Sequence, residues 1–447
     1  MTATRRAALG LVLAVALVAV AFAVPRWADW EVWPRAPRSM SDLAIPPLHG
    51  LWEPKWFGPG TVPALVLALL GCRYAVGLAG RLPWRRLLTA SYVAALAWML
   101  ALALVDGESG LTRVLGSDVE YLPTARDVDD VGELLRTYVD RIPYDAAPDN
   151  WPTHVAGHPP LALLFFVGLV RIGLGGDLAA ALVVVVLAAA TAPLVLATVR
   201  VLGAEGAARR AAPFLVLTPA AVVMAVSADA LFGAVAAAGL LCLALGATRP
   251  ADRRRAAVAW SVLAGLLLGC CVMLSYGLGL LAFLAVAVLV LARSWLPLPV
   301  AAASALVVVL GFAAGGFAWW EAYPVLNDRY WEGIAADRPA AYWMWGNLAA
   351  LLVCTGPLLG AGLASVRRTS FRRPDLVVVL LAGAALLAVA AADLSRMSKA
   401  EVERIWLPFV PWMVLTTALL PERWRRWGLG LQVAFALLVQ HLLYTSW

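Results

Sequence analysis

The sequence predicts an all-α, polytopic membrane protein that folds as one helix bundle. Hydrophobic residues make up 62% of the 447 residues and charged residues only 14%, so no soluble core could bury the apolar surface. About 13–14 hydrophobic segments approach the roughly 20 residues that a helix needs to cross a bilayer. Short arginine-rich turns separate many of them, which accounts for the net charge of +7 by positive-inside topology. We expect no nucleic-acid partner, because no basic face is long enough to follow a phosphate backbone.

The first apolar run, residues 7–24, predicts an uncleaved span. Arg5 and Arg6 precede it, and Ala21-Phe22-Ala23 resembles a cleavage site, so a signal peptide is the alternative. Further spans are predicted at residues 62–78 and 88–105. We treat the chain as a single integral membrane domain, with a two-span extension at residues 1–87 and the main bundle at residues 88–447.

The loop at residues 106–160 is the longest polar gap and is mostly acidic, which favours the extracytoplasmic side. Apolar residues recur in it at helical spacing and predict an amphipathic helix over residues 128–142, lying on the membrane surface. They are Val128, Val131, Leu134, Leu135, Tyr138 and Ile142. Pro143 marks the end of this helix, and Pro159-Pro160 the start of the next span.

The stretch from residue 161 to 245 contains four apolar runs, at residues 161–174, 177–200, 211–226 and 230–245. Arg253, Arg254 and Arg255 belong in the cytoplasm, which puts Asp229 outside. Four full crossings that start from the extracytoplasmic loop would instead leave these arginines outside. We expect one piece before residue 226 to be short or re-entrant. Pro213 and Pro219 are the predicted breakers.

The remaining spans alternate regularly with basic turns and with outer loops at residues 319–343 and 393–404. They are predicted at residues 258–274, 278–291, 299–317, 345–364, 376–392, 406–420 and 428–443. This pattern predicts a cytoplasmic N-terminus and an extracytoplasmic C-terminus in a cell membrane. Lys55 and Lys399 are the only lysines among many arginines, a bias typical of GC-rich bacterial genomes.

Ionisable side chains lie at the outer ends of the spans and hardly ever within them. Because charges inside a bilayer are costly and mark function there, this distribution favours an outer-face site over an ion path through the membrane. The residues are Asp106, Asp118, Glu120, His154, His158, Asp229, Asp328, Arg329, Lys399, Glu403 and Arg404.

The order of these residues resembles that of the GT-C glycosyltransferases, and within them the branch of protein O-mannosyltransferases and the lipid A aminoarabinose transferase. The resemblance covers residues 88–411. Its motifs are the acidic pair Asp118 and Glu120, His158-Pro159-Pro160-Leu161 after the amphipathic helix, Leu217-Thr218-Pro219 followed by Ser227-Ala228-Asp229-Ala230-Leu231, and Glu403-Arg404-Ile405-Trp406-Leu407-Pro408.

The resemblance implies an inverting sugar transfer from a polyprenyl-phosphate donor to an extracytoplasmic acceptor, among membrane lipids. Such a reaction needs a carboxylate to deprotonate the acceptor hydroxyl and cations to hold the departing phosphate. Asp118 and Glu120 are the candidates for the base and its partner. Val119 separates them, which leaves open which of the two is the base. The acids would suit either a proton or a divalent metal.

Six further residues are candidates at this site. Asp106 is a second acid or a helix-end carboxylate. His158 either contacts the lipid phosphate or orients a carboxylate, and His154 is a weaker candidate. Arg404 and Lys399 are predicted phosphate clamps, and Asp229 is expected to be structural or to line the substrate site.

Two other functions stay open from the sequence. A transporter or flippase for a lipid or small solute would show spans broken at the midplane and often an internal repeat. A non-catalytic membrane scaffold would keep the fold without a site.

Overall fold

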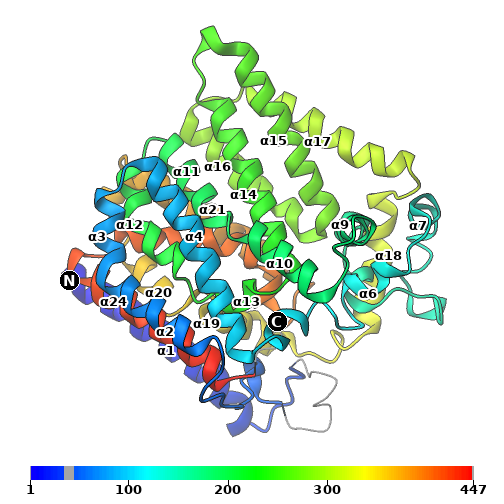
Figure 1. Cartoon of the computed structure of the whole chain (residues 1–447), viewed down its shortest axis with the longest axis horizontal. Helices are drawn as coiled ribbons and strands as arrows, with labels where there is room; N and C mark the ends of the chain where they lie inside the picture. The colour runs from blue at the N-terminus through cyan, green and yellow to red at the C-terminus, as the bar shows by residue number, and fades with distance from the viewer. Residues whose placement is uncertain (1, 35–44, 445–447) are drawn as a thin grey trace.

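The computed structural model describes residues 2–34 and 45–444, and within them every regular element is helical. Two extended segments meet there only at an isolated bridge between Trp52 and Leu443. The predicted all-α fold is therefore confirmed. Figure 1 shows the helices packed against one another as one bundle, with α14 near its middle.

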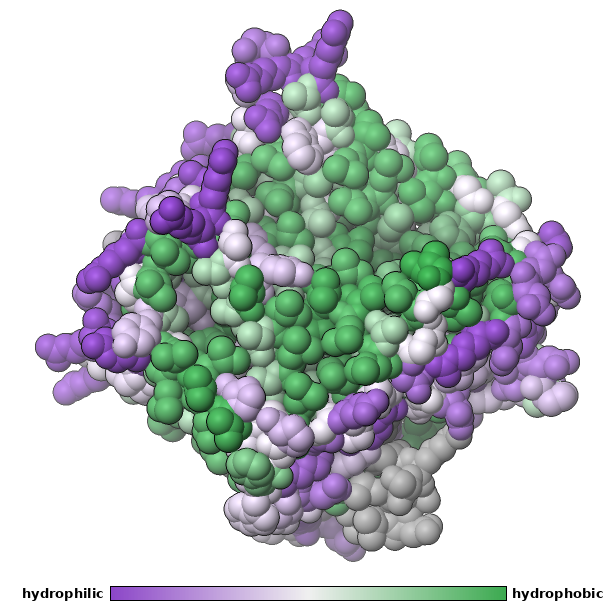
Figure 2. All heavy atoms as spheres, viewed as in Figure 1, coloured by the Kyte–Doolittle hydropathy of each residue, from purple (hydrophilic) through white to green (hydrophobic). Residues whose placement is uncertain are grey.

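Eight helical stretches of the described residues are long and apolar enough to cross a bilayer, so the chain is a multi-pass membrane protein. They are α1 (Ala3–Trp27), α2–η3–α3 (Thr61–Leu70, Gly71–Ala75 and Val76–Arg81), α4–η4 (Trp84–Ala103 and Leu104–Asp106), α10–α11 (Asp177–Ala188 and Thr191–Val201), α14 (Ala228–Ala247), α15 (Arg254–Leu274), α17 (Pro297–Ala314) and α21 (Asp375–Leu394). Figure 2 shows a broad apolar face with polar residues along two opposite edges.

Several other apolar elements are short or broken. Short ones are α9 (Pro160–Arg171), η7–α16 (Tyr276–Leu280 and Leu281–Ala292) and η9–α23–η10 (Leu407–Phe409, Val410–Val414 and Leu415–Leu419). The pair α19 (Ala340–Thr355) and α20 (Leu358–Ala364) bends by 103°. The last helix, α24, is Glu422–Leu442.

The predicted irregularity between residues 161 and 226 is confirmed. The helix α9 has only 12 residues. The next predicted span divides into α12 (Glu205–Val216) and the single turn α13 (Ala221–Met224), with Pro219 in the gap. Pro213 lies inside α12 and does not end it.

The segment between the first two predicted spans, the predicted outer loops and the end of the last helix meet at one end of the bundle. Lys55 Nζ lies 2.6 Å from a carboxylate oxygen of Asp106, and Glu53 N donates to Leu442 O at 3.1 Å, near the end of α24. Arg338 donates to Trp33 O at 2.9 Å. These segments are far apart in sequence, so their meeting agrees with the predicted alternation of sides.

At the other end of the bundle, arginine side chains of α12 contact segments from other parts of the chain. Arg209 donates to Ala79 O and Leu82 O at 2.9 Å, and Arg210 donates to Asp375 at 2.8 Å. Guanidinium groups that bind the last carbonyls of a helix satisfy acceptors left free there. The chain therefore has two polar ends with the apolar helices between them.

Short helices and loops cover the first of these ends. They are η2 (Pro47–His49), α5 (Ser109–Thr112), α6 (Tyr121–Arg126), α7 (Val131–Thr137), η5 (Tyr144–Ala146), α8 (Thr153–Ala156), α18 (Trp319–Glu332) and α22 (Val402–Ile405); η6 (Ala251–Arg253) and η8 (Arg368–Phe371) belong to the predicted cytoplasmic turns.

The amphipathic helix is shorter than the predicted range of residues 128–142. The helix α7 begins after Asp130, whose carboxylate accepts from Gly132 N at 2.7 Å and Glu133 N at 3.2 Å, and ends at Thr137. An aspartate in that position satisfies amides that start a helix. Beyond it, Tyr138 and Ile142 are fully buried in turns, because tertiary contacts hold them rather than helical periodicity.

Candidate functional site

Four ionisable side chains from distant parts of the chain form one cluster. Arg404 Nη1 donates to Glu120 Oε1 at 2.6 Å, and Arg404 Nε donates to Asp229 Oδ2 at 2.5 Å. His154 Nδ1 lies 2.7 Å from the same oxygen of Glu120. Glu120, Asp229 and Arg404 are only 1–4% exposed. Buried charges are tolerated only when they are paired in this way, so each of these side chains depends on the others for its buried position.

Local structure holds each acid in place. Glu120 occupies the cap position before α6, and His154 N donates to Val119 O at 3.1 Å, which ties α8 to this turn. Asp229 lies in the first turn of α14, where the helix dipole favours a carboxylate. The Ala- and Gly-rich surface of α14 permits close packing against α15.

Arg404 belongs to the single turn α22. The buried side-chain amide of Asn347 holds the segment that leads into this turn. Asn347 of α19 donates to Asp393 Oδ1 and Ser398 O at 2.8 Å, and accepts from Ala400 N at 3.1 Å. Ala400 has a positive φ of 65°, a conformation unusual for a residue other than glycine. The contacts of Asn347 therefore fix the path of the chain into Arg404.

The mutual pairing sets the charge states of the cluster. Burial alone would raise the pKa of Glu120, but the charges of Arg404 and His154 outweigh it and hold this pKa well below its usual range. Burial would lower the pKa of Arg404, but Glu120 and Asp229 raise it well above its usual value. Glu120 is therefore a fully ionised carboxylate and a poor proton acceptor at neutral pH.

A cavity of about 250 Å³ opens beside this cluster. Its polar lining comes from η5, residues 153–158, the start of α14, residues 329–338 and residues 398–404. These residues include Tyr144, His154, His158, Asp229, Arg329, Tyr330, Arg338, Ser398, Lys399, Glu401 and Arg404. Glu120 does not line the cavity, but it contacts two residues that do, Arg404 and His154. The lining is rich in cations and aromatic rings, which suits an anionic ligand that carries a ring with hydroxyl groups.

Three cations in the cavity wall bind backbone carbonyls. Lys399 Nζ donates to Ala335 O at 2.8 Å and to Arg338 O at 2.9 Å. Arg338 donates to Lys399 O at 2.6 Å, and Arg329 donates to Ile142 O and to Trp151 O. An ammonium has three N–H donors, so Lys399 keeps one beyond these two bonds.

The two members of the predicted acidic pair lie in different places. Glu120 is in the buried cluster, whereas Asp118 is exposed and lines a separate groove of about 520 Å³. That groove also contains Asp127, Asp129 and Glu133.

The other predicted residues divide in the same way. His154, His158, Asp229, Lys399 and Arg404 all line the cavity. Asp106 lies at the end of η4, where it pairs with Lys55 at 2.6 Å and with Arg113 at 3.3 Å, and it does not line the cavity.

Sequence reasoning missed Arg338 and Tyr330 as cavity residues. The signal was the aromatic-rich segment at residues 319–343, predicted to be an outer loop, which contains both. Tyr330 accepts from Lys399 N through its hydroxyl at 3.0 Å, so this loop forms one wall of the cavity.

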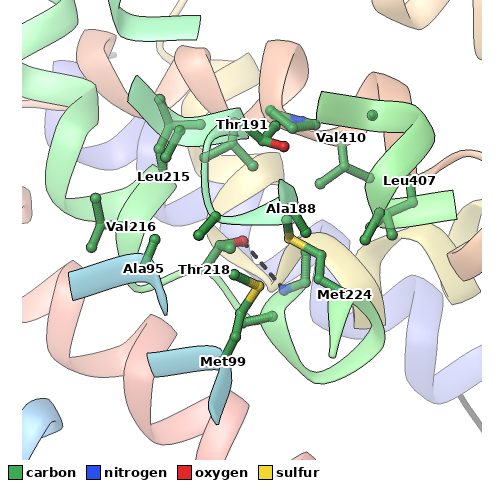
Figure 3. Close-up of a pocket in the computed structure, with 18 residues that line it drawn as sticks. Ala95, Met99, Ala188, Thr191, Leu215, Val216, Thr218, Met224, Leu407 and Val410 are labelled. Atoms are coloured by element: carbon green, nitrogen blue, oxygen red, sulfur yellow. Dashed lines mark hydrogen bonds between the residues drawn. The ribbon is translucent and has the colours of Figure 1, made fainter. Parts of the chain in front are cut away.

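A second, apolar cavity of about 30 Å³ adjoins the first turns of α14 and η9 (Figure 3). Its wall includes Met99, Thr218, Met224 and Leu407, and Thr218 Oγ1 accepts from Ala220 N at 3.2 Å. This volume suffices for water-sized groups only, so it holds no sugar.

No three His, Cys, Asp or Glu side chains of residues 2–34 and 45–444 are grouped so that they could hold a metal ion. No protein-family model, curated protein or solved structure matches this chain significantly.

Proposed function

We propose that this protein is a glycosyltransferase that takes a sugar from a polyprenyl-phosphate donor at the extracytoplasmic face of the cell membrane. The observation that carries the proposal is the cavity beside the Glu120–His154–Asp229–Arg404 cluster. The cavity lies at the end of the bundle predicted to be extracytoplasmic, with the N-terminus cytoplasmic and the C-terminus on the same side as the cavity.

The cavity supplies the groups that this reaction needs. In an inverting transfer the acceptor oxygen attacks the anomeric carbon, the bond from that carbon to the phosphate oxygen breaks, and the phosphate leaves with the electron pair. Arg404 and the remaining N–H of Lys399 offer positive charge for the leaving phosphate. Tyr144 and Tyr330 offer ring faces and hydroxyls for the sugar.

Donor turnover tests the proposal. Purified protein in lipid nanodiscs is incubated with a panel of polyprenyl-phosphate monosaccharides, and release of polyprenyl phosphate is measured with and without a bacterial envelope extract as the source of acceptor. We expect release from at least one donor, and loss of release in Arg404→Ala. No release from any donor, in protein that is shown to be folded, would reject the enzyme.

A transporter or flippase is the second candidate, because one candidate span is bent and another predicted span is divided. The pair α19–α20 bends by 103°, and α12 and α13 are separated at Pro219. Discontinuous helices of this kind often bind substrates in transporters. Movement of a fluorescent polyprenyl-phosphate lipid between leaflets of proteoliposomes, without cleavage of the donor, would favour this function.

A further inference from the structure

His158, which lies between α8 and α9, has a defined tautomer. His158 Nδ1 lies 2.9 Å from His154 O. A carbonyl oxygen only accepts, so Nδ1 carries the hydrogen, and in the neutral ring Nε2 keeps a lone pair. Nε2 makes no hydrogen bond with any residue of the described chain. The ring therefore offers one proton acceptor that the protein itself does not use.

Packing holds this ring at the cavity. Tyr121 lies edge-on to it at a centroid distance of 5.6 Å, and Phe232 of α14 lies at 5.9 Å. Tyr138 donates through its hydroxyl to His158 O at 3.1 Å. His158 lines the cavity together with Asp229 and Arg404.

The other candidate acceptors are less suited. Glu120 does not line the cavity, and its Oε1 already accepts from Arg404 and His154. Asp229 lines it but accepts from Arg404 through Oδ2. Burial lowers the pKa of His158, and the charges of Arg404 and His154 lower it further, whereas the charge of Asp229 raises it. The net shift is downward, so the ring is neutral at pH 7.

From this geometry we infer that His158 is the general base of the transfer, a role that rests on the proposed function. The acceptor hydroxyl gives its proton to Nε2 while its oxygen forms the bond to the anomeric carbon. The bond from that carbon to the phosphate oxygen breaks, and its electron pair leaves on polyprenyl phosphate. The proton then leaves the imidazolium for water in the cavity, and Asp229 stabilises that cation meanwhile. Glu120 is a positioning residue that holds Arg404.

The pH dependence of the wild-type enzyme distinguishes a base from a phosphate-binding cation. A base must be unprotonated, so kcat for release of polyprenyl phosphate falls as the pH drops through the pKa of His158, below its ordinary 6.5. A histidine that holds the phosphate as a cation gives the opposite slope, with kcat falling as the pH rises. The charged and titratable groups that face the ring are Asp229, Arg404, His154 and Tyr121.

Substitution completes the test. His158→Gln and His158→Ala should lower kcat by about 10²–10⁴-fold, the usual contribution of a general base, and lose the acid limb of the pH profile. Imidazole should restore part of the activity of His158→Ala. His441→Ala is the matched control, because that histidine lies in α24 and bonds to Leu437 O and Thr61.

The outcomes separate the two proposals. If the wild type turns over donor and both His158 variants keep full activity, His158 is not the base, but the proposed transferase function is unaffected. A reversed pH slope of the wild type leads to the same conclusion. No turnover by the wild type overturns both. If the variants fail to fold, as thermal unfolding would show, the wild-type pH slope alone decides.

Discussion

Asp118 and Glu120 stand one residue apart, yet their surroundings differ completely. Glu120 is 1% exposed and paired with Arg404 and His154, whereas Asp118 is exposed in another groove. Replacement of Glu120 removes the charge that orients Arg404. Replacement of Asp118 changes an exposed carboxylate that lies outside this cluster, in the other groove.

We therefore expect Glu120→Gln to lower kcat by about 10²-fold, the effect of misplacing a group at a site. Asp118→Asn should lower it far less, and Asp127→Asn in the same groove serves as its control. Release of polyprenyl phosphate in nanodiscs is the measurement. Equal losses in Glu120→Gln and Asp118→Asn would show that the exposed acid takes part in the reaction.

Arg404 neutralises two buried carboxylates, so its removal should also affect folding. Arg404→Ala leaves Glu120 and Asp229 without their shared cation, and breaking a buried ion pair in this way costs about 3–5 kcal/mol. We expect a clearly lower unfolding midpoint in detergent, partly restored by adding Glu120→Gln. Arg423→Ala, at an exposed arginine of α24, is the control and should have little effect.

At the scale of elements, the short helix α7 packs against the bundle through two leucines. Leu134 is 5% exposed and Leu135 packs against the core, whereas Arg136 is exposed. Changing Leu134 and Leu135 together to Glu would force charges into an apolar contact, a large cost. We expect this double variant to lose expression and thermal stability, and Arg136→Glu to be mild. Equal tolerance of both would show that α7 does not pack on the bundle.

The first span, α1, approaches α20 closely at two glycines, Gly10 and Gly360. A Cβ added at Gly10 of α1 would lie 2.2 Å from Gly360 O of α20, whereas one added at Gly77 of α3 would meet nothing within 4 Å. Small residues permit such close approach of membrane helices. We therefore expect Gly10→Val to lower the unfolding midpoint in detergent and Gly77→Val to leave it unchanged. A harmless Gly10→Val would support the alternative that this segment is a removable signal peptide.

At the scale of the whole molecule, the two polar ends make the orientation testable. Asp145 is exposed at the cavity end, and Thr369 is exposed beside the basic turns. Ser370 beside it is 4% exposed and unsuitable for labelling. We expect a membrane-impermeant maleimide applied to whole cells to label Asp145→Cys and spare Thr369→Cys until the membrane is opened. The reverse pattern would place the cavity in the cytoplasm and reject an extracytoplasmic transferase.

Much of the architecture was predictable because it depends on local properties. The length of an apolar run and the charge of the turn after it decide where a span begins and ends. The parity conflict before residue 226 predicted a break, and Pro219 lies in it. The end of α7 was not predictable, because Tyr138 and Ile142 continue the helical spacing but are buried by contacts from other segments.

The sequence by itself determined an all-α membrane bundle and a set of ionisable residues at its outer ends, since hydrophobicity acts on each segment separately. Only the tertiary structure decided which of them meet. Arg404 is 284 residues from Glu120 and 175 from Asp229 in the chain, and no local pattern spans such distances. The pairing also separates Glu120 from Asp118, because a buried charge is tolerated only where an opposite charge from another helix reaches it.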